Sequence, residues 1–378
     1  MQRTATLAAI ALLVGLPAIG APAGKAPASQ LKPGPWGSGW NPSDAAIADI
    51  DGDGNADLVV SYASTGRVNI CLGDGTGSFG DAAEIETDPG VRAVAVGFRG
   101  GERVPFIAVL NRRTESVSFH LRDEEGRFVP LPTTLPAGKS PVAIAVGYSD
   151  ADRLDPFVVV ANQGSNDLSL YLPDESGGFA ARTVDLKRKG QPDPSPSSVA
   201  TGDFDSDGLM DDLVVTNKKY QTLTLLFGRE RGEFERRYKD VLVREGPEDV
   251  AACSVGKPGE PLLVVANRLD REATIYARAD ESVFGLREAG LVRARGGLVS
   301  VSLAEVGTMG TALLAVASRV RGEVFVFLVE PGGETTEVGV FPADPDIRSV
   351  AAGCLSGADK PFVLAAGRGL YPIPLFDR

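Results

Sequence analysis

The sequence predicts an all-β fold, a seven-bladed β-propeller with four antiparallel strands in each blade. The 378 residues include 45 Gly and 26 Pro but only 7% aromatic residues, which favours short strands and tight turns over helices. A unit of about 50 residues recurs along the chain. Its copies begin near residues 45, 94, 144, 199, 250, 301 and 350. Seven units of four strands around a channel make a single domain.

Each predicted strand has its own pattern. The first is small and alternating, as at 94–97, and the second is a continuous apolar run, as at 157–160. The third alternates, as at 223–225, and the fourth is weaker. Two landmarks keep the same period: a residue that ends the second strand, and a Gly-x-Phe turn before the fourth. The first landmark comprises Asn111, Asn162, Asn217 and Asn267, and the second lies at 77–79, 126–128, 177–179 and 232–234. We interpret both as turn architecture.

The two ends of the chain are predicted to close the ring. The last copy stops after its third strand, near 370–376, so one strand is missing. We expect residues 29–40 to supply it, because Pro33 and Pro35 are tolerated only in an outer edge strand. Trp36 and Trp40 are then expected to cover that blade. The propeller domain is predicted at 29–378, after a short linker at 21–28.

Residues 1–20 are typical of a secretory signal peptide. Arg3 precedes an apolar run at 7–16, and small residues at 18–20 offer a cleavage site. No other segment is long and apolar enough to span a membrane. We therefore expect a secreted or periplasmic protein. Cys71, Cys253 and Cys354 lie in apolar strands, which favours buried thiols, although a disulfide between two of them stays open.

Two aspartate-rich loops follow first strands and indicate bound Ca2+. Carboxylates on alternate residues repel one another unless a cation lies between them, and Ca2+ takes six or more oxygen ligands at about 2.4 Å. In copy one the expected ligands are Asp49, Asp51, Asp53, the Asn55 carbonyl and Asp57. In copy four they are Asp203, Asp205, Asp207, the Leu209 carbonyl, and either Asp211 or Asp212. A third set in copy three, Asp150, Asp152 and Asp155, has Arg153 in place of the glycine and is expected to have lost its ion.

The loops are not EF-hands. Position twelve is Val60 in one copy and Val214 in the other, where an EF-hand needs a bidentate glutamate, and a strand follows instead of a helix. The order of apolar strand, Asp-rich loop and Asp-Leu-Val-Val resembles the FG-GAP or VCBS-type repeat of integrin α-subunit propellers and secreted bacterial proteins. The resemblance implies an adhesion or ligand-binding platform, with calcium loops on the face away from the ligand.

Charge and side-chain inventory narrow the function. A net charge of -12 argues against nucleic acid as a partner. The one histidine, His120, lies at a packing position of a third strand, so a Ser-His-Asp triad or a His-ligated zinc site has too few members. The loops between strands 1 and 2 and between 3 and 4 are acidic. The opposite face is basic. Its candidate ligand-binding residues are Arg112, Arg113, Lys218, Lys219, Tyr220, Arg319, Arg321 and Arg368, near a long insertion that begins at Lys187.

We therefore predict a non-enzymatic, calcium-stabilised binding module that meets a protein or an anionic glycan on the basic face. The alternative is a carbohydrate-active protein, either a lectin or a polysaccharide lyase, that uses the same face. A lyase without histidine would need a base such as Tyr220, beside Lys218 and Lys219. The sequence leaves the ligand and the oligomeric state open.

Overall fold

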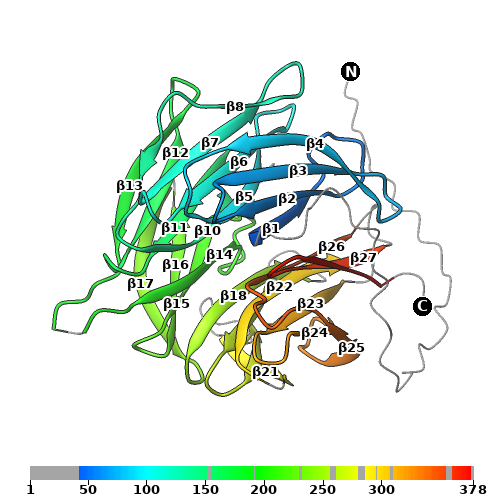
Figure 1. The fold of residues 1–378 in the computed structure, drawn as a ribbon. Helices are drawn as coiled ribbons and strands as arrows, with labels where there is room; N and C mark the ends of the chain where they lie inside the picture. The colour runs from blue at the N-terminus through cyan, green and yellow to red at the C-terminus, as the bar shows by residue number, and fades with distance from the viewer. Residues whose placement is uncertain are drawn as a thin grey trace, which may run out of the picture.

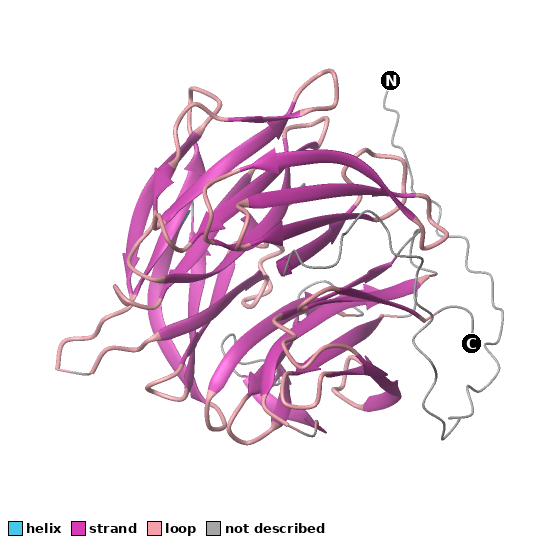
Figure 2. Ribbon diagram, viewed as in Figure 1, coloured by secondary structure: helices cyan, strands magenta, loops and turns pink. Residues whose placement is uncertain are grey.

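The computed structural model describes residues 42–375, apart from 151–154, 191, 230–231, 256–260, 280–285, 295, 307–309 and 355–359. The described residues form strands and loops without helices, arranged in seven sheets around a central axis (Figures 1 and 2). The all-β, seven-bladed prediction is confirmed. No helix with the length and hydropathy to cross a bilayer occurs in this part of the chain.

The blades follow chain order, each running from its innermost to its outermost strand. Blade 1 comprises β1 (Pro42–Ala48), β2 (Asp57–Tyr62), β3 (Arg67–Gly73) and β4 (Phe79–Glu86). Blade 2 comprises β5 (Val91–Arg99), β6 (Val104–Asn111) and β7 (Ser116–Arg122), with its outer strand split into β8 (Phe128–Pro130) and β9 (Leu135–Pro136). Blade 3 comprises β10 (Pro141–Tyr148), β11 (Pro156–Asn162), β12 (Asp167–Pro173) and β13 (Phe179–Asp185). Blade 4 comprises β14 (Pro196–Gly202), β15 (Asp212–Asn217), β16 (Thr222–Arg229) and β17 (Glu233–Leu242).

The remaining blades keep the same order. Blade 5 comprises β18 (Pro247–Ser254), β19 (Pro261–Asn267), β20 (Glu272–Arg278) and β21 (Leu286–Arg293). Blade 6 comprises β22 (Leu298–Val306), β23 (Thr311–Ser318), β24 (Glu323–Val329) and β25 (Thr335–Pro342). Blade 7 comprises β26 (Ser349–Cys354), β27 (Pro361–Ala366) and β28 (Leu370–Pro374). Its outer strand is absent from the described residues, and the segment expected to supply it, 29–40, lies outside them.

The core consists of seven apolar clusters, one between each pair of neighbouring blades. The second strands are buried throughout because both of their faces meet another blade, which explains their continuous apolar runs. The cluster between blades 7 and 1 includes Tyr62 and Leu58 packed with Phe362 and Leu364. The ring therefore closes through side-chain packing at this seam.

Hydrogen bonds between first strands tie the blades together around the channel. Asp44 of β1 accepts a bond from Ser349 Oγ of blade 7 at 2.6 Å and from the Val94 amide of blade 2 at 3.2 Å. Asp249 of β18 does the same with Ser198 Oγ of blade 4 at 2.6 Å and the Val301 amide of blade 6 at 3.0 Å. Each carboxylate thus joins the two blades that flank its own.

Both sequence landmarks are architectural. The asparagines end their second strands, and three of them donate to a hydroxyl of the third strand, as Asn217 Nδ2 does to Thr224 Oγ1 at 2.8 Å. The glycines of Gly-x-Phe have positive φ, for example 82° at Gly177, so the turn requires a residue without a Cβ. None of the three cysteines forms a disulfide, and Cys71 is buried whereas Cys253 and Cys354 are half-buried.

Candidate calcium loops and the basic face

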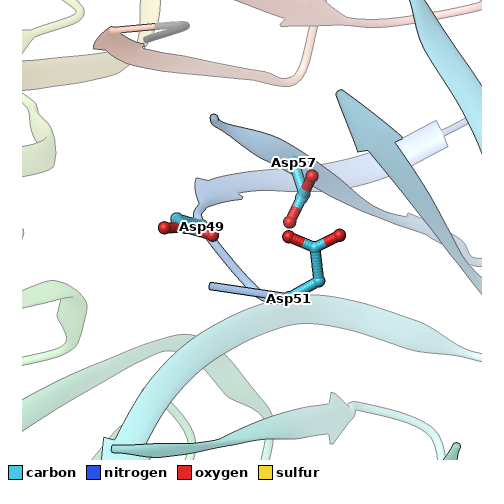
Figure 3. A group of neighbouring side chains, drawn as sticks. All are labelled: Asp49, Asp51 and Asp57. Carbon is cyan, nitrogen blue, oxygen red and sulfur yellow. The ribbon is translucent and has the colours of Figure 1, made fainter. Parts of the chain in front are cut away.

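The first aspartate loop connects β1 to β2 in blade 1. Asp49, Asp51 and Asp57 each place a carboxylate oxygen within 4.8 Å of the others, and Figure 3 shows Asp51 and Asp57 pointing toward one another. Two ligands of one calcium ion cannot lie farther apart than about 5 Å, twice the Ca–O distance. The three oxygens therefore meet the spacing that one calcium ion requires.

Backbone amides hold these carboxylates in place. Asp49 accepts from the amides of Gly52 and Gly54 at 2.8 and 3.0 Å. Asp57 is buried at the start of β2, and it accepts from the Ile50 amide at 2.7 Å and from the Gly73 amide of β3 at 2.8 Å. The loop is thus shaped by its own aspartates before any ion binds.

The loop of blade 4 repeats this arrangement despite its extra residue. Asp203, Asp205 and Asp212 form the second group of oxygens within 4.8 Å. Asp212 accepts from the Phe204 amide at 2.6 Å and from the Gly228 amide of β16 at 2.8 Å, as Asp57 does from Ile50 and Gly73. Asp212, rather than Asp211, is therefore the counterpart of Asp57, a choice that the sequence left open.

The other expected carboxylate ligands are not in these groups. Asp53 and Asp207 are exposed, and their carboxylates accept from the amides of Asn55 and Leu209 at 2.7 and 2.8 Å. Asp211 is buried, and its Oδ1 has no hydrogen-bond partner. In copy three, Asp150 accepts from the Asp155 amide at 2.8 Å, but Asp152 lies outside the described residues.

The carboxylates of blade 4 are electrostatically unfavourable without a cation. Burial, followed by repulsion from Asp205 and Asp211, raises the pKa of Asp212 to about 8. Burial and the charges of Asp207 and Asp205 raise the pKa of Asp211 to about 6. In blade 1, burial raises the pKa of Asp57 above its ordinary value. Either a proton or a bound cation relieves this repulsion.

The basic residues lie on the opposite face, in the loops after second strands and in the connections between blades. This placement follows from the antiparallel order, which puts alternate loops at opposite ends of a blade. Several of the charges are neutralised: Lys218 pairs with Glu248 at 2.9 Å, Arg188 with Asp240 at 2.6 Å, and Arg368 with Asp346 at 2.5 Å. Arg319 donates to the Ile347 carbonyl at 3.3 Å. The exposed residues of this set are Arg112, Arg113, Lys219, Arg319, Arg321 and Arg368.

Neither Tyr220, the candidate base, nor His120, predicted as a packing residue, has a pKa shifted toward neutral pH. The Tyr220 hydroxyl is buried without a partner, and burial raises its pKa, which is the wrong direction for a base. His120 is buried in β7 and bonds to Ser118 at 3.1 Å, and burial lowers its pKa to about 4. The packing role predicted for His120 agrees with this environment.

Two features were missed from the sequence. The first is the set of charged residues that line the channel from four blades: Arg92, Arg348, Asp44 and Asp249. The second is a pair of exposed apolar residues on the basic face, Leu269 and Val320. Both lie in short loops after second strands, where only the blade arrangement shows that they are neighbours.

Searches with this chain found similarity in structure alone. No family model and no curated protein sequence matches it. The β-propeller domain of Myceliophteria thermophila Cps50 (Swd1) is 12% identical, with a TM-score of 0.59 over 86% of this chain and 95% of that one. The Pseudomonas aeruginosa periplasmic gluconolactonase PpgL is 14% identical, with a TM-score of 0.56 over 82% and 92%. A putative 6-phosphogluconolactonase from Bacteroides uniformis is 13% identical, with a TM-score of 0.58 over 79% and 85%. At these identities the likeness shows the propeller fold and nothing finer.

Proposed function

We propose that this chain is a secreted or periplasmic binding module, a propeller that is stabilised by Ca2+ in blades 1 and 4 and that meets its partner on the basic face. The observation that carries the proposal is the pair of equivalent carboxylate groups at the loops of blades 1 and 4. Both lie on the face opposite the basic loops. Ions buried in loops on one face leave the other face available for a partner.

Calcium dependence of stability tests the first half of the proposal. Extracellular calcium modules bind with a Kd of about 10⁻⁴ to 10⁻³ M. At a concentration of 100 Kd each site would stabilise the fold by about 2.7 kcal/mol. We expect the melting temperature to rise with calcium, less so in Asp51→Ala or Asp205→Ala, and not at all in the double variant. An unchanged melting temperature with calcium or chelator would refute it.

Partner binding tests the second half. The mature chain with calcium is applied to a pull-down and to a glycan array, beside a variant with Arg112, Arg113, Lys218 and Lys219 reversed in charge. We expect the reversal to weaken capture of the partner, because basic loops on one face together attract an anionic surface. Capture that the reversal leaves unchanged would place the contact outside these two loops.

A sugar-lactone hydrolase is the second candidate function. It is favoured by the names of two structural neighbours and by the polar channel, which Asp44, Asp249, Arg92 and Arg348 line. Incubation with 6-phosphogluconolactone decides between the two. Ring opening faster than the spontaneous rate, and lost in Arg92→Ala with Arg348→Ala, would support the hydrolase; a rate equal to the spontaneous one would support the binding module.

A further inference from the structure

A groove between blades 5 and 6 opens on the basic face and is unlike the rest of it. Its volume is about 650 Å³. One wall is the loop after β19 (268–271), and the other includes Val320 and Arg321 of the loop after β23. The connection between the blades, with Gly296 and Gly297, lies between the two walls.

The walls expose aliphatic side chains to water. Leu269 is 63% exposed and Val320 is 73% exposed. Only four large hydrophobic residues are exposed in the described part of the chain, and a third, Leu242 at 80%, ends β17 on the same face in the neighbouring blade 4. Three of the four therefore lie on one face, and two of them, Leu269 and Val320, line the same groove, which is typical of a contact surface.

The floor of the groove includes two glycines, Gly296 and Gly297. A methyl group at Gly297 would lie 3.6 Å from Val320 Cγ2 and 3.8 Å from Arg268 Cγ, so one glycine separates the two walls. Leu269 lies over Gly246, whose Cβ would meet Leu269 Cγ at 2.8 Å. Gly246 and Gly297 therefore place no side chain of their own against Leu269 and Val320.

The charge that remains in the groove is positive. Among the described residues, four arginines line it, against Asp270 and Glu272. Glu272 is bound by Arg293 at 3.2 Å and by Arg244 at 3.3 Å, and Asp270 accepts from the Glu245 amide at 2.7 Å. Arg268 lies 3.9 Å from Glu248. Within the described residues, Arg271 and Arg321 have no ion-pair partner, and they flank the apolar walls.

We propose that this groove docks a protein segment that inserts an apolar side chain between Leu269 and Val320 and places carboxylates against Arg271 and Arg321. This inference rests on the proposed function and narrows it to one groove and one chemistry. Aliphatic walls favour a protein partner over a glycan. Burial of Leu269 and Val320 is favourable where they contact an apolar group, and protein side chains supply such groups. Charge complementarity selects acidic flanking residues.

The test uses the full mature chain with calcium and a phage-displayed library of random peptides as the probe. We expect the selected peptides to share an apolar residue flanked by Asp or Glu. A synthetic peptide of the consensus should bind about tenfold or more weakly to Leu269→Ser with Val320→Ser, and to Arg271→Glu with Arg321→Glu. Gly297→Tyr should block binding by filling the groove, since the backbone there does not require glycine.

The controls separate this inference from the proposed function. Val129→Ser removes the fourth exposed hydrophobic residue, in blade 2, and should leave binding unchanged. Each variant must keep the wild-type calcium-dependent melting shift, which shows that the propeller is intact. Peptide binding lost only on reversal of Arg112 and Arg113 would overturn the groove but keep the basic face. Peptides that bind every variant equally would overturn both.

Three further results would overturn the inference: a basic consensus, glycan binding that depends on Leu269 and Val320, or a dimer that the Leu269→Ser and Val320→Ser substitutions dissociate. The last two would assign the groove to a glycan or to a second copy of the chain. The inference would be supported by a consensus peptide with an apolar residue flanked by acidic ones, if its binding is weakened by all three groove variants.

Discussion

Individual aspartates in the two loops have distinct roles. Asp57 and Asp212 accept two or more backbone amides each and therefore anchor the loop to the third strand, whereas Asp49, Asp51, Asp203 and Asp205 complete the oxygen groups. Alternation of aspartates predicted that these carboxylates lie close together, as they do, while their role as Ca2+ ligands stays a prediction. It could not show that Asp53 and Asp207 lie outside the two oxygen groups, because their exposure depends on the backbone conformation of the loop.

Calcium affinity in blade 4 should fall as the pH falls. The pKa of Asp212 is about 8 without an ion, so calcium must displace a proton below that pH. For one displaced proton the affinity should weaken by up to about tenfold per pH unit. Without calcium, the stability of the fold should change with pH in the opposite direction. Because the pKa of Asp212 is higher in the folded than in the unfolded chain, the free energy of unfolding should fall as the pH rises from about 4 to about 8.

Calorimetric titration of Asp51→Ala with calcium at pH 8, 7 and 6 measures this dependence, because that variant keeps only the loop of blade 4. Repeating it in buffers of different ionisation enthalpy counts the protons released. An affinity that does not change between pH 8 and 6 would contradict the assignment of Asp212 as a ligand.

At the scale of the element, the strands were predictable because each has a periodicity of its own. The seven predicted copy starts lie in the first strands of the seven blades, and the four landmark asparagines end second strands. Boundaries of outer strands were less clear: that of blade 2 is split into β8 and β9 around 131–134, and only the structure reveals the break. Outer strands have one neighbour, so their sequence is less constrained.

The Gly-x-Phe turn provides a matched pair of substitutions. Gly177 has a φ of 82° with no atom near its Cβ position, so Gly177→Ala should cost roughly 1 kcal/mol through backbone strain alone. At Gly178 φ is ordinary and a Cβ would make contacts of 3.4 Å or more, so Gly178→Ala should be neutral or slightly stabilising. Urea unfolding of both variants measures the difference. Equal effects would show that the turn adopts another conformation.

At the scale of the molecule, the ring is joined by interblade clusters and by two buried carboxylate bridges. Repetition of the unit predicted the number of blades, because seven copies with one period have few other arrangements. The bridges at Asp44 and Asp249 were not predictable, since their partners lie about 50 residues away or at the other end of the chain. The groove at Leu269 was not predictable either, because its walls come from loops about 50 residues apart in the sequence.

Removing one bridge should loosen the ring. Asp249→Ala deletes the bonds to Ser198 and Val301 and leaves a buried amide without a partner, which should lower the free energy of unfolding by roughly 2–4 kcal/mol. Chemical denaturation measures it, with the exposed Glu124→Ala as the control. A loss no greater than that of the control would show that the bridge contributes nothing.

Deleting residues 24–40 tests ring closure by the chain's start. If this segment supplies the outer strand of blade 7, its loss exposes the edge of β28 and should lower the melting temperature sharply. An unchanged melting temperature would leave the packing of Tyr62 and Leu58 against Phe362 and Leu364 as sufficient closure.

The most direct test of calcium stabilisation is the number of calcium ions bound per chain, measured by native mass spectrometry on the mature protein. The two oxygen groups predict two ions in the wild type, one in Asp51→Ala or Asp205→Ala, and none in the double variant. No bound calcium in the wild type, or the same number in all four proteins, would contradict it.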